Sequence, residues 1–209
     1  MRIRLCLHRF IACAALAVLA AGPAAARLVG DSPVSFRAER TVTIDGHSYT
    51  GLLFHEQGHE RHEQVLLGMN EVFLLDIAQA QGYLIVPSIK TYVAFHFPSL
   101  MAELDAPDLL RHPVGTATVS GIPTTAYRID HRARDGSRAK GALWLSAKGI
   151  LMKLAVTVTR AHGGKPIPIT MTLSHVEPGK QDQALFVLPP GLVALPKTAL
   201  SPLLGGQLP

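Results

Sequence analysis

The sequence predicts one mainly β (α+β) domain built from short antiparallel strands, and three observations support this. Apolar and polar residues alternate with a period of two along several segments, which is typical of strands with one buried face. Two-residue turn signals recur at short spacing, as expected for hairpins. Segments with helical periodicity are scarce, although 48% of the 209 residues are hydrophobic and could supply a core.

The first 26 residues have the layout of a secretory signal peptide. Arg2, Arg4 and Arg9 form a positively charged start, and residues 10–21 form an uncharged apolar segment. The small residues Ala24–Ala26 then offer a cleavage site. The apolar segment is shorter than the roughly 20 residues that a membrane-spanning helix needs. We therefore expect export to the periplasm, and we do not expect an integral membrane protein.

Removal of residues 1–26 changes what the composition implies. The net charge of +5 falls to +2, because three of the 20 basic residues and none of the 15 acidic residues are removed. Cys6 and Cys13, the two cysteines, leave with the signal peptide. This excludes thiol catalysis, iron–sulfur clusters and cysteine zinc sites, and it disfavours nucleic-acid binding. We expect a single domain over residues 27–196 and a flexible tail over 197–209.

The strands are predicted by alternation and by turns. From Val34 to Asp45 every second residue is apolar except Arg40, and the residues between them are polar. The same alternation recurs over residues 150–159 and 167–174, and about nine or ten strands are expected in all. The predicted turns are Asp45-Gly46, Gln57-Gly58, Gln81-Gly82, Asp135-Gly136, Lys148-Gly149 and Gly163-Gly164.

One short helical insertion is predicted over Ser99–Leu110. Ser99 follows Pro98 and can cap the helix, and a partial apolar stripe follows it. Pro107 lies within the segment, so we expect the helix to end or restart there.

A long sheet with one apolar face must bury that face against something. A single short helix cannot cover it, so the sheet either curls into a barrel or half-barrel, packs as a β-sandwich, or leaves part of the face for a ligand. We expect about half of the face to be ordinary core. The alternation predicts that the apolar, ligand-binding face contains Phe36, Val42, Ile44, Ile150, Met152, Leu154, Val156, Ile169, Met171 and Leu173.

Residues His55–His59 match the H-E-x-x-H pattern of zinc proteases. That chemistry needs a helix, but Gly58 disfavours one and Gln57-Gly58 is a good hairpin turn. A polar, solvated hairpin is the leading interpretation. A metal site formed by His55, His59 and His62 remains an alternative. We assign no catalytic residue, no metal ligand and no cofactor.

A basic segment, Arg132–Lys140, surrounds another predicted turn. Its cations could contact a protein partner or anionic headgroups, although a solvated hairpin tip is the simpler interpretation. A protein-interaction module that binds an envelope protein through this hairpin is therefore a second functional hypothesis.

The order of segments over about residues 36–196 resembles the secreted, uncharacterised branch of the LolA/LolB-like superfamily of lipoprotein carriers and receptors. Three motifs carry the resemblance: V-G-x-x-x-V-x-G at 114–121, W-x-x-x-x-G-I-L-M-K at 144–153 and F-x-x-P-x-G at 186–191. The resemblance implies an unclosed, strongly curved antiparallel half-barrel whose concave apolar face holds acyl chains. It also implies a non-catalytic periplasmic protein whose partner is a lipid or the acyl chain of a lipoprotein. No ligand-contacting residue follows from it.

Overall fold

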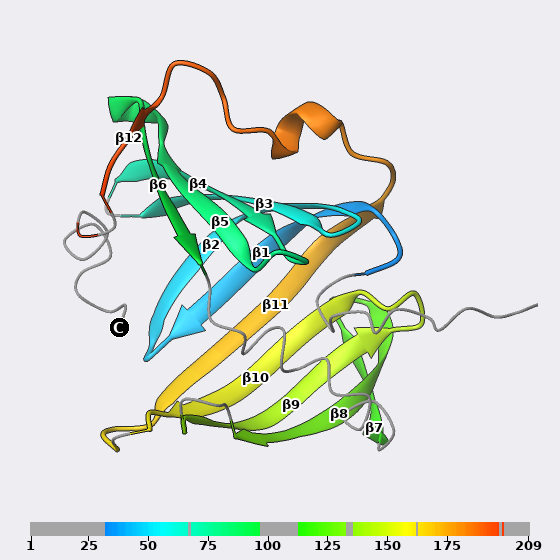
Figure 1. The fold of residues 1–209 in the computed structure, drawn as a ribbon. Coiled ribbons are helices and arrows are strands. Elements are labelled where there is room, and N and C mark those ends of the chain that lie inside the picture. The colour runs from blue at the N-terminus through cyan, green and yellow to red at the C-terminus, as the bar shows by residue number, and fades with distance from the viewer. Residues whose placement is uncertain are drawn as a thin grey trace, which may run out of the picture.

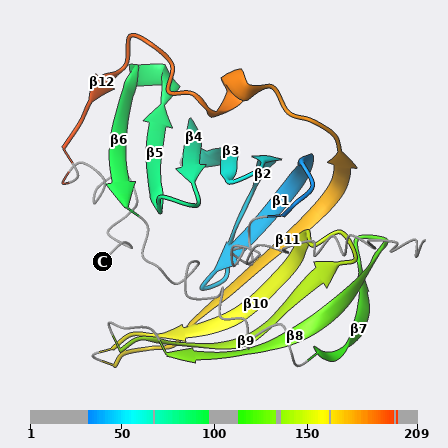
Figure 2. The same cartoon turned by 45° about the vertical axis from the view of Figure 1, so that its right-hand side comes forward.

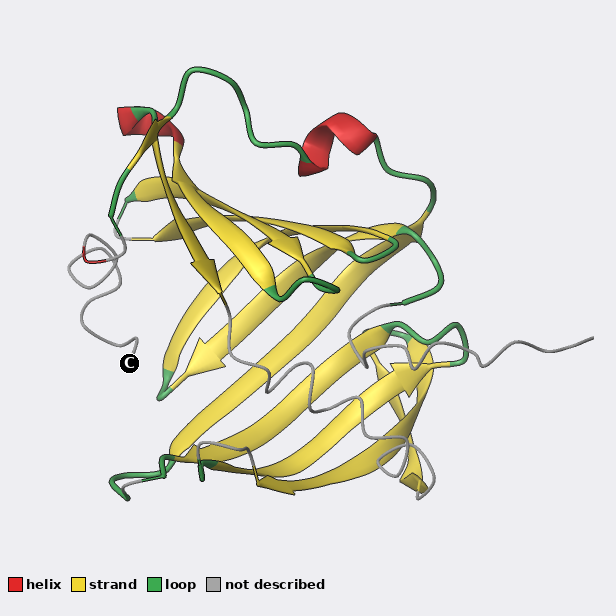
Figure 3. Cartoon of the chain, in the orientation of Figure 1, coloured by secondary structure: helices red, strands yellow, loops and turns green. Residues whose placement is uncertain are grey.

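The computed structural model describes residues 32–66, 68–96, 113–132, 136–161, 163–196 and 198. These residues form one twelve-stranded sheet, and the helical elements among them are two short 3-10 turns, η1 (Pro87–Ile89) and η3 (Gln183–Phe186) (Figure 3). The strands are β1 (Phe36–Ile44), β2 (His47–Glu56), β3 (His59–Leu66), β4 (Met69–Asp76), β5 (Gln81–Val86), β6 (Thr91–His96), β7 (Pro113–Val119), β8 (Ile122–Arg132), β9 (Arg138–Ser146), β10 (Leu151–Thr159), β11 (Ile167–Pro178) and β12 (Val193–Ala194).

The strand order is β12-β6-β5-β4-β3-β2-β1-β11-β10-β9-β8-β7. Neighbours are antiparallel except β12, which runs parallel to β6. Two series of hairpins are therefore joined along β1 and β11, with Phe36 opposite Pro178 and Ile44 opposite Ile169. We call β1–β6 with β12 the upper half and β7–β11 the lower half, as they lie in Figure 1.

The sheet is strongly curved, so that the two halves enclose a concave side between them (Figures 1 and 2). It does not close into a barrel among the described residues, because β12 and β7 each pair with one neighbour only. The predicted mainly β, curved and open antiparallel architecture is confirmed. The expected strand number of nine or ten is wrong, since the sheet has twelve strands.

Most predicted turns lie between strands, including Asp45-Gly46 and Gln57-Gly58. The predicted turn at Gln81-Gly82 is wrong, because both residues belong to β5. A Cβ at Gly82 would lie 2.8 Å from side-chain atoms of Leu75 and Phe95, so this glycine serves close packing. The true turn precedes it and is stabilised by Asp76, whose Oδ1 accepts a 2.9 Å hydrogen bond from the backbone N–H of Gln79.

A C-terminal strap, residues 179–196, crosses the outer face of the upper half (Figure 2). Its Leu188 and Leu192 pack against a buried cluster of Val72, Leu74 and Ile85. Because the strap covers these residues from outside, the opposite face of the same strands is the inner, concave one. On β1 that inner face carries the even-numbered residues from Phe36 to Ile44, as the register with β2 and β11 requires.

The predicted signal peptide (1–26), helical insertion (Ser99–Leu110) and tail (197–209, apart from residue 198) lie outside the described residues. Within the described part of the chain, no helix has the length and apolar character needed to cross a membrane.

Candidate functional site

Apolar side chains form two cross-strand rows on the inner face at the joint and in the lower half. The outer face of the same strands is rich in threonine, with Thr43 opposite Thr170. Successive strand pairings define the two rows, which we call the apolar rows: Val42, Met171, Leu154 and Leu143, and beside them Ile44, Ile169 and Val156.

The ten residues predicted to bind an apolar ligand divide into two groups by burial. Half of them are buried in the protein's own core: Phe36, Ile150, Met152, Leu173 and Val156, of which Val156 belongs to the apolar rows. The others are only partly buried and lie in the apolar rows: Val42, Ile44, Leu154, Ile169 and Met171. Their position on the inner face is established, and their role in ligand binding stays a prediction.

Alternation fails at one point in this set. The pairing of β10 with β9 shifts register between Leu151 and Lys153, and both Leu151 and Met152 are buried as a result. Ile150 lies just before β10 and packs in the core with Met152.

The inner face of the upper half combines buried apolar side chains, among them Leu53, Leu84 and Val93, with a group of charged and polar ones. The register places Arg40 opposite Gly51, Gly51 opposite Gln64, and Gln64 opposite Glu71, so these residues form one row across four strands. The next row along the strands contributes His62, and the row after it contributes His55, which lies opposite Glu60. We call the following six residues the inner polar cluster: Arg40, His55, Glu60, His62, Gln64 and Glu71.

Glu60 is the centre of one half of the cluster. Its Oε2 lies 2.7 Å from His62 Nε2, and its Oε1 lies 3.4 Å from His55 Nδ1. Burial alone would raise the pKa of Glu60, but hydrogen bonds from the two histidines and their charge lower it to about 2. Burial and the charge of Arg40 lower the pKa of His62. At neutral pH Glu60 is therefore a carboxylate and His62 is neutral, and the charge of His62 acts on Glu60 only in acid, once this histidine is protonated.

His55 fixes this arrangement from the side of β2. Its ring is fully buried and stacks on Phe36, with ring centroids 5.1 Å apart. Its Nε2 donates a 2.9 Å hydrogen bond to the backbone carbonyl of Ser32, since a carbonyl can only accept. The segment before β1 is thus tied to the polar cluster.

Arg40, Gln64 and Glu71 form the other half of the cluster. Arg40 Nη2 donates to Gln64 Oε1 at 3.2 Å, and Gln64 Nε2 donates to Glu71 Oε2 at 3.4 Å. Gly51, which lies between Arg40 and Gln64, has no side chain to separate them. A Cβ there would collide with the carbonyl oxygen of Glu63. The close approach of β2 to β3 therefore requires glycine at this position.

This second half is incompletely hydrogen-bonded. Glu71 is 1% exposed, and its Oε1 has no hydrogen-bond partner among the described residues. Within the same part of the chain, Arg40 Nε is also buried and without a partner. Burial lowers the pKa of Arg40 and raises the pKa of Glu71. The row thus ends in one unmatched donor and one unmatched acceptor.

The predicted hairpin at His55–His59 is confirmed, since β2 ends at Glu56 and β3 begins at His59. The expectation that it is solvated is wrong, because His55 is 0% and His62 is 8% exposed. They are buried because their strands turn them to the inner face.

The three histidines of the alternative metal site do not share a face. His59 lies on the outer face near Phe186 of the strap, opposite to His55 and His62. Its strand neighbour Glu56 accepts a 2.7 Å hydrogen bond from the backbone N–H of Gln181. Among the described residues, no three or more His, Cys, Asp or Glu side chains are grouped to hold a metal ion.

The basic segment Arg132–Lys140 includes the facing ends of β8 and β9, with Arg132 opposite Arg138. Residues 133–135 lie outside the described part of the chain, and in the part that is described Asp130 partly neutralises the basic charge. Arg138 donates two hydrogen bonds to this carboxylate, at 2.8 and 2.9 Å, and Lys140 lies 3.9 Å from it.

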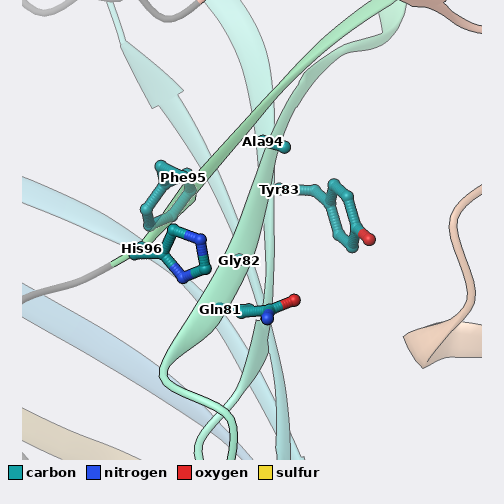
Figure 4. Close-up of a pocket in the computed structure, with 6 residues that line it drawn as sticks. All are labelled: Gln81, Gly82, Tyr83, Ala94, Phe95 and His96. Carbon is teal, nitrogen blue, oxygen red and sulfur yellow. The ribbon is translucent and has the colours of Figure 1, made fainter.

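A small pocket of about 60 Å³ lies at the far end of the upper half. Figure 4 shows its lining residues, which all come from β5 and β6: Gln81, Gly82, Tyr83, Ala94, Phe95 and His96. Pockets for drug-sized molecules measure roughly 300 Å³ or more, so this one is too small for a lipid.

The sequence interpretation missed Glu60, Gln64 and Glu71 as site residues. One signal was present, because Arg40 is the single polar residue on the apolar face of its segment. In β3 the residues Glu60, His62 and Gln64 also alternate with Arg61, Glu63 and Val65. Both faces of this strand are largely polar, so alternation could not show which one is buried.

Comparison with known proteins gives structural matches only, since no family model and no curated protein matches the chain. An uncharacterized conserved protein from Thermus thermophilus matches with a TM-score of 0.51 and 9% identity, over 78% of this chain and 91% of that one. MucB in complex with MucA(peri) matches with a TM-score of 0.48 and 17% identity, over 79% and 58%. The Pseudomonas aeruginosa MucA/MucB complex matches with a TM-score of 0.48 and 18% identity, over 78% of this chain and 65% of that one.

This chain therefore spans less than two thirds of the length of the MucB chains that it matches. At these identities the likenesses concern the fold alone, and the Thermus thermophilus protein supports the arrangement of strands described above.

Proposed function

We propose that this protein is an exported, non-catalytic binding protein that holds an apolar chain of a lipid or lipoprotein against the apolar rows. The observation that carries this proposal is the partial exposure of Val42, Leu154 and Met171 on the concave side of an open sheet. The periplasmic location rests on the predicted signal peptide at residues 1–26.

The two faces of the joint differ in a way that favours an apolar ligand. The side chains of Thr41 and Thr43 on the outer face bond to Thr50 and Ser48, at 3.1 and 2.8 Å, and suit contact with water. The inner face at the same strands offers aliphatic side chains without such partners. Covering them with an alkyl chain stabilises the complex by about 0.8 kcal/mol for each buried CH₂ group. No catalytic group is needed for this function.

The dependence of affinity on chain length tests the proposal. Decanoate, dodecanoate and tetradecanoate are titrated into the mature protein by calorimetry. Each added pair of CH₂ groups should tighten binding about tenfold, because the added methylenes are buried. Absence of binding, or an affinity independent of chain length, would contradict the proposal.

A matched pair of variants locates the site. Met171→Glu places a charge in the apolar rows and should abolish tetradecanoate binding. Thr170→Glu places the same charge one residue away on the exposed outer face and should leave the affinity unchanged. Thermal unfolding of both variants checks that they are folded. Equal loss of binding in both would rule out the inner face as the site.

A further inference from the structure

The inner polar cluster adjoins the apolar rows directly. Arg40 and Val42 are two residues apart on the inner face of β1, and their partners on β11 are Leu173 and Met171. Residues two apart on a strand lie about 7 Å from one another. The polar cluster therefore begins within the length of a lipid molecule that lies on the apolar rows.

The two unmatched atoms of the cluster have opposite requirements. Arg40 Nε can only donate a hydrogen bond, and a carboxylate oxygen such as Glu71 Oε1 can only accept one. Gln64 lies between the two side chains and bonds to both, so the cation and the anion do not neutralise each other by direct contact.

Leaving both atoms unmatched is costly in a buried site, since a buried polar group without a partner loses its hydration and gains nothing. Arg40 is partly compensated by the charge of Glu60. The energetic cost is larger for Glu71, because its one described hydrogen bond comes from a neutral amide, that of Gln64. A ligand that supplies an N–H donor to Glu71 and an acceptor to Arg40 would satisfy the whole row.

We propose that the inner polar cluster selects a zwitterionic phospholipid headgroup, with the phosphate bound by Arg40 and a primary ammonium bound by Glu71. The inference rests on the proposed function, because the acyl chains of the same lipid would cover the apolar rows. It adds a headgroup preference that the apolar rows alone cannot provide.

Other headgroups satisfy the row less well. A trimethylammonium group carries positive charge but no N–H, so it leaves Glu71 Oε1 without a donor. A glycerol headgroup offers hydroxyl donors but no cation to match the Glu71 carboxylate. Guanidinium–phosphate hydrogen bonds are available to all three lipids and give no discrimination among them.

Calorimetry with short-chain lipids tests the headgroup preference. Dihexanoyl phosphatidylethanolamine, phosphatidylcholine and phosphatidylglycerol are titrated below their micelle concentrations into the mature protein. The ethanolamine lipid should bind about tenfold more tightly than the other two, as expected for one charge-assisted hydrogen bond. Glu71→Gln should remove this preference, whereas Glu177→Gln, which changes an exposed carboxylate, should retain it.

The outcomes separate the two proposals. Equal affinity of the unmodified protein for all three lipids would overturn the headgroup assignment without need of a variant, and so would a preference that persists in Glu71→Gln. In either case the chain-length dependence of fatty-acid binding would still stand. If neither fatty acids nor phospholipids bind, the proposed function fails, and the headgroup assignment fails with it.

Discussion

The inner faces of the two halves of the sheet differ in chemistry although they share one curved sheet. The lower half presents Leu143, Met152 and Val156, which are buried and apolar. The upper half presents His55 and Glu71 at the same level of burial. Apolar packing stabilises both halves, whereas the polar cluster of the upper half adds stability only where its charges and hydrogen bonds are matched, as they are around Glu60.

This difference teaches that burial alone does not identify a binding face. The apolar rows offer apolar area without directional hydrogen-bonding groups. The polar cluster offers direction, because each donor and acceptor requires a partner in a defined place. Under the proposed function, a concave face that combines both would hold an amphiphile in one orientation.

The largest expected effect comes from removing the centre of the polar cluster. Glu60→Ala leaves His55 and Arg40 buried without their carboxylate, and should lower the free energy of unfolding by about 3–5 kcal/mol. Urea denaturation measures this loss. Glu63→Ala on the outer face of β3 is the control and should cost less than about 1 kcal/mol, because its pair with Arg61 is partly exposed. Similar losses in both variants would mean that the buried carboxylate of Glu60 stabilises the fold no more than the partly exposed carboxylate of Glu63 does.

The apolar half should respond to cavities. Met152→Ala removes a fully buried side chain and should lower the free energy of unfolding by about 2–5 kcal/mol. Val42→Ala changes a partly exposed side chain of the apolar rows, and a loss below about 1.5 kcal/mol is expected. Chemical denaturation of both variants provides the comparison. An equal loss would show that the rows are core and leave no surface for a ligand.

Acid should weaken the upper half selectively. The folded pKa of Glu60, about 2, lies below its ordinary value of 4.5, so its contribution is present above pH 4.5 and disappears as pH falls toward 2. The difference corresponds to about 3 kcal/mol. The lowered pKa of His62 acts in the same direction below pH 6.5, because the unfolded chain then binds the additional proton. Unfolding curves between pH 7 and 2.5 should show this loss, and Glu60→Gln should flatten the profile below pH 4.5. If Glu60→Gln loses stability in acid as the unmodified protein does, the Glu60 carboxylate is not the source of the acid sensitivity.

The smallest effect is expected at Glu71. Burial raises the pKa of Glu71, so the folded protein keeps this proton to a higher pH than the unfolded chain does, and stability is lost as pH rises through the folded value and the carboxylate forms. Glu71→Gln should therefore raise the free energy of unfolding at pH 8, by no more than about 1 kcal/mol, and have less effect at pH 4. A clear destabilisation at pH 8 would show that the carboxylate has a stabilising partner.

The fold could be predicted because its strands alternate regularly. The segment around Arg40 and the segments that form β10 and β11 each show one apolar face, and two-residue turns mark most hairpins. The prediction failed at Gly82, where a glycine needed for packing resembles a turn residue. The strand number was underestimated.

The candidate site was predicted only in its apolar part. Val42 and Met171 follow from alternation within single strands. The polar cluster depends on long-range register, which brings Arg40, Gln64 and Glu71 into one row, and local sequence contains no record of that register. The isolated Arg40 on an apolar face indicated that a partner was needed, but it could not identify the partner.

The joint between β1 and β11 has a consequence for how the chain folds. The hairpins of each half connect neighbours in sequence, and such local contacts form quickly. The pairing of Phe36 with Pro178 closes almost the whole domain, and the strap that covers the upper half follows β11 in the chain. Both contacts therefore need a nearly complete polypeptide. We expect a slow final folding phase in which the halves are joined, and the concave face should remain open to chaperones until that moment.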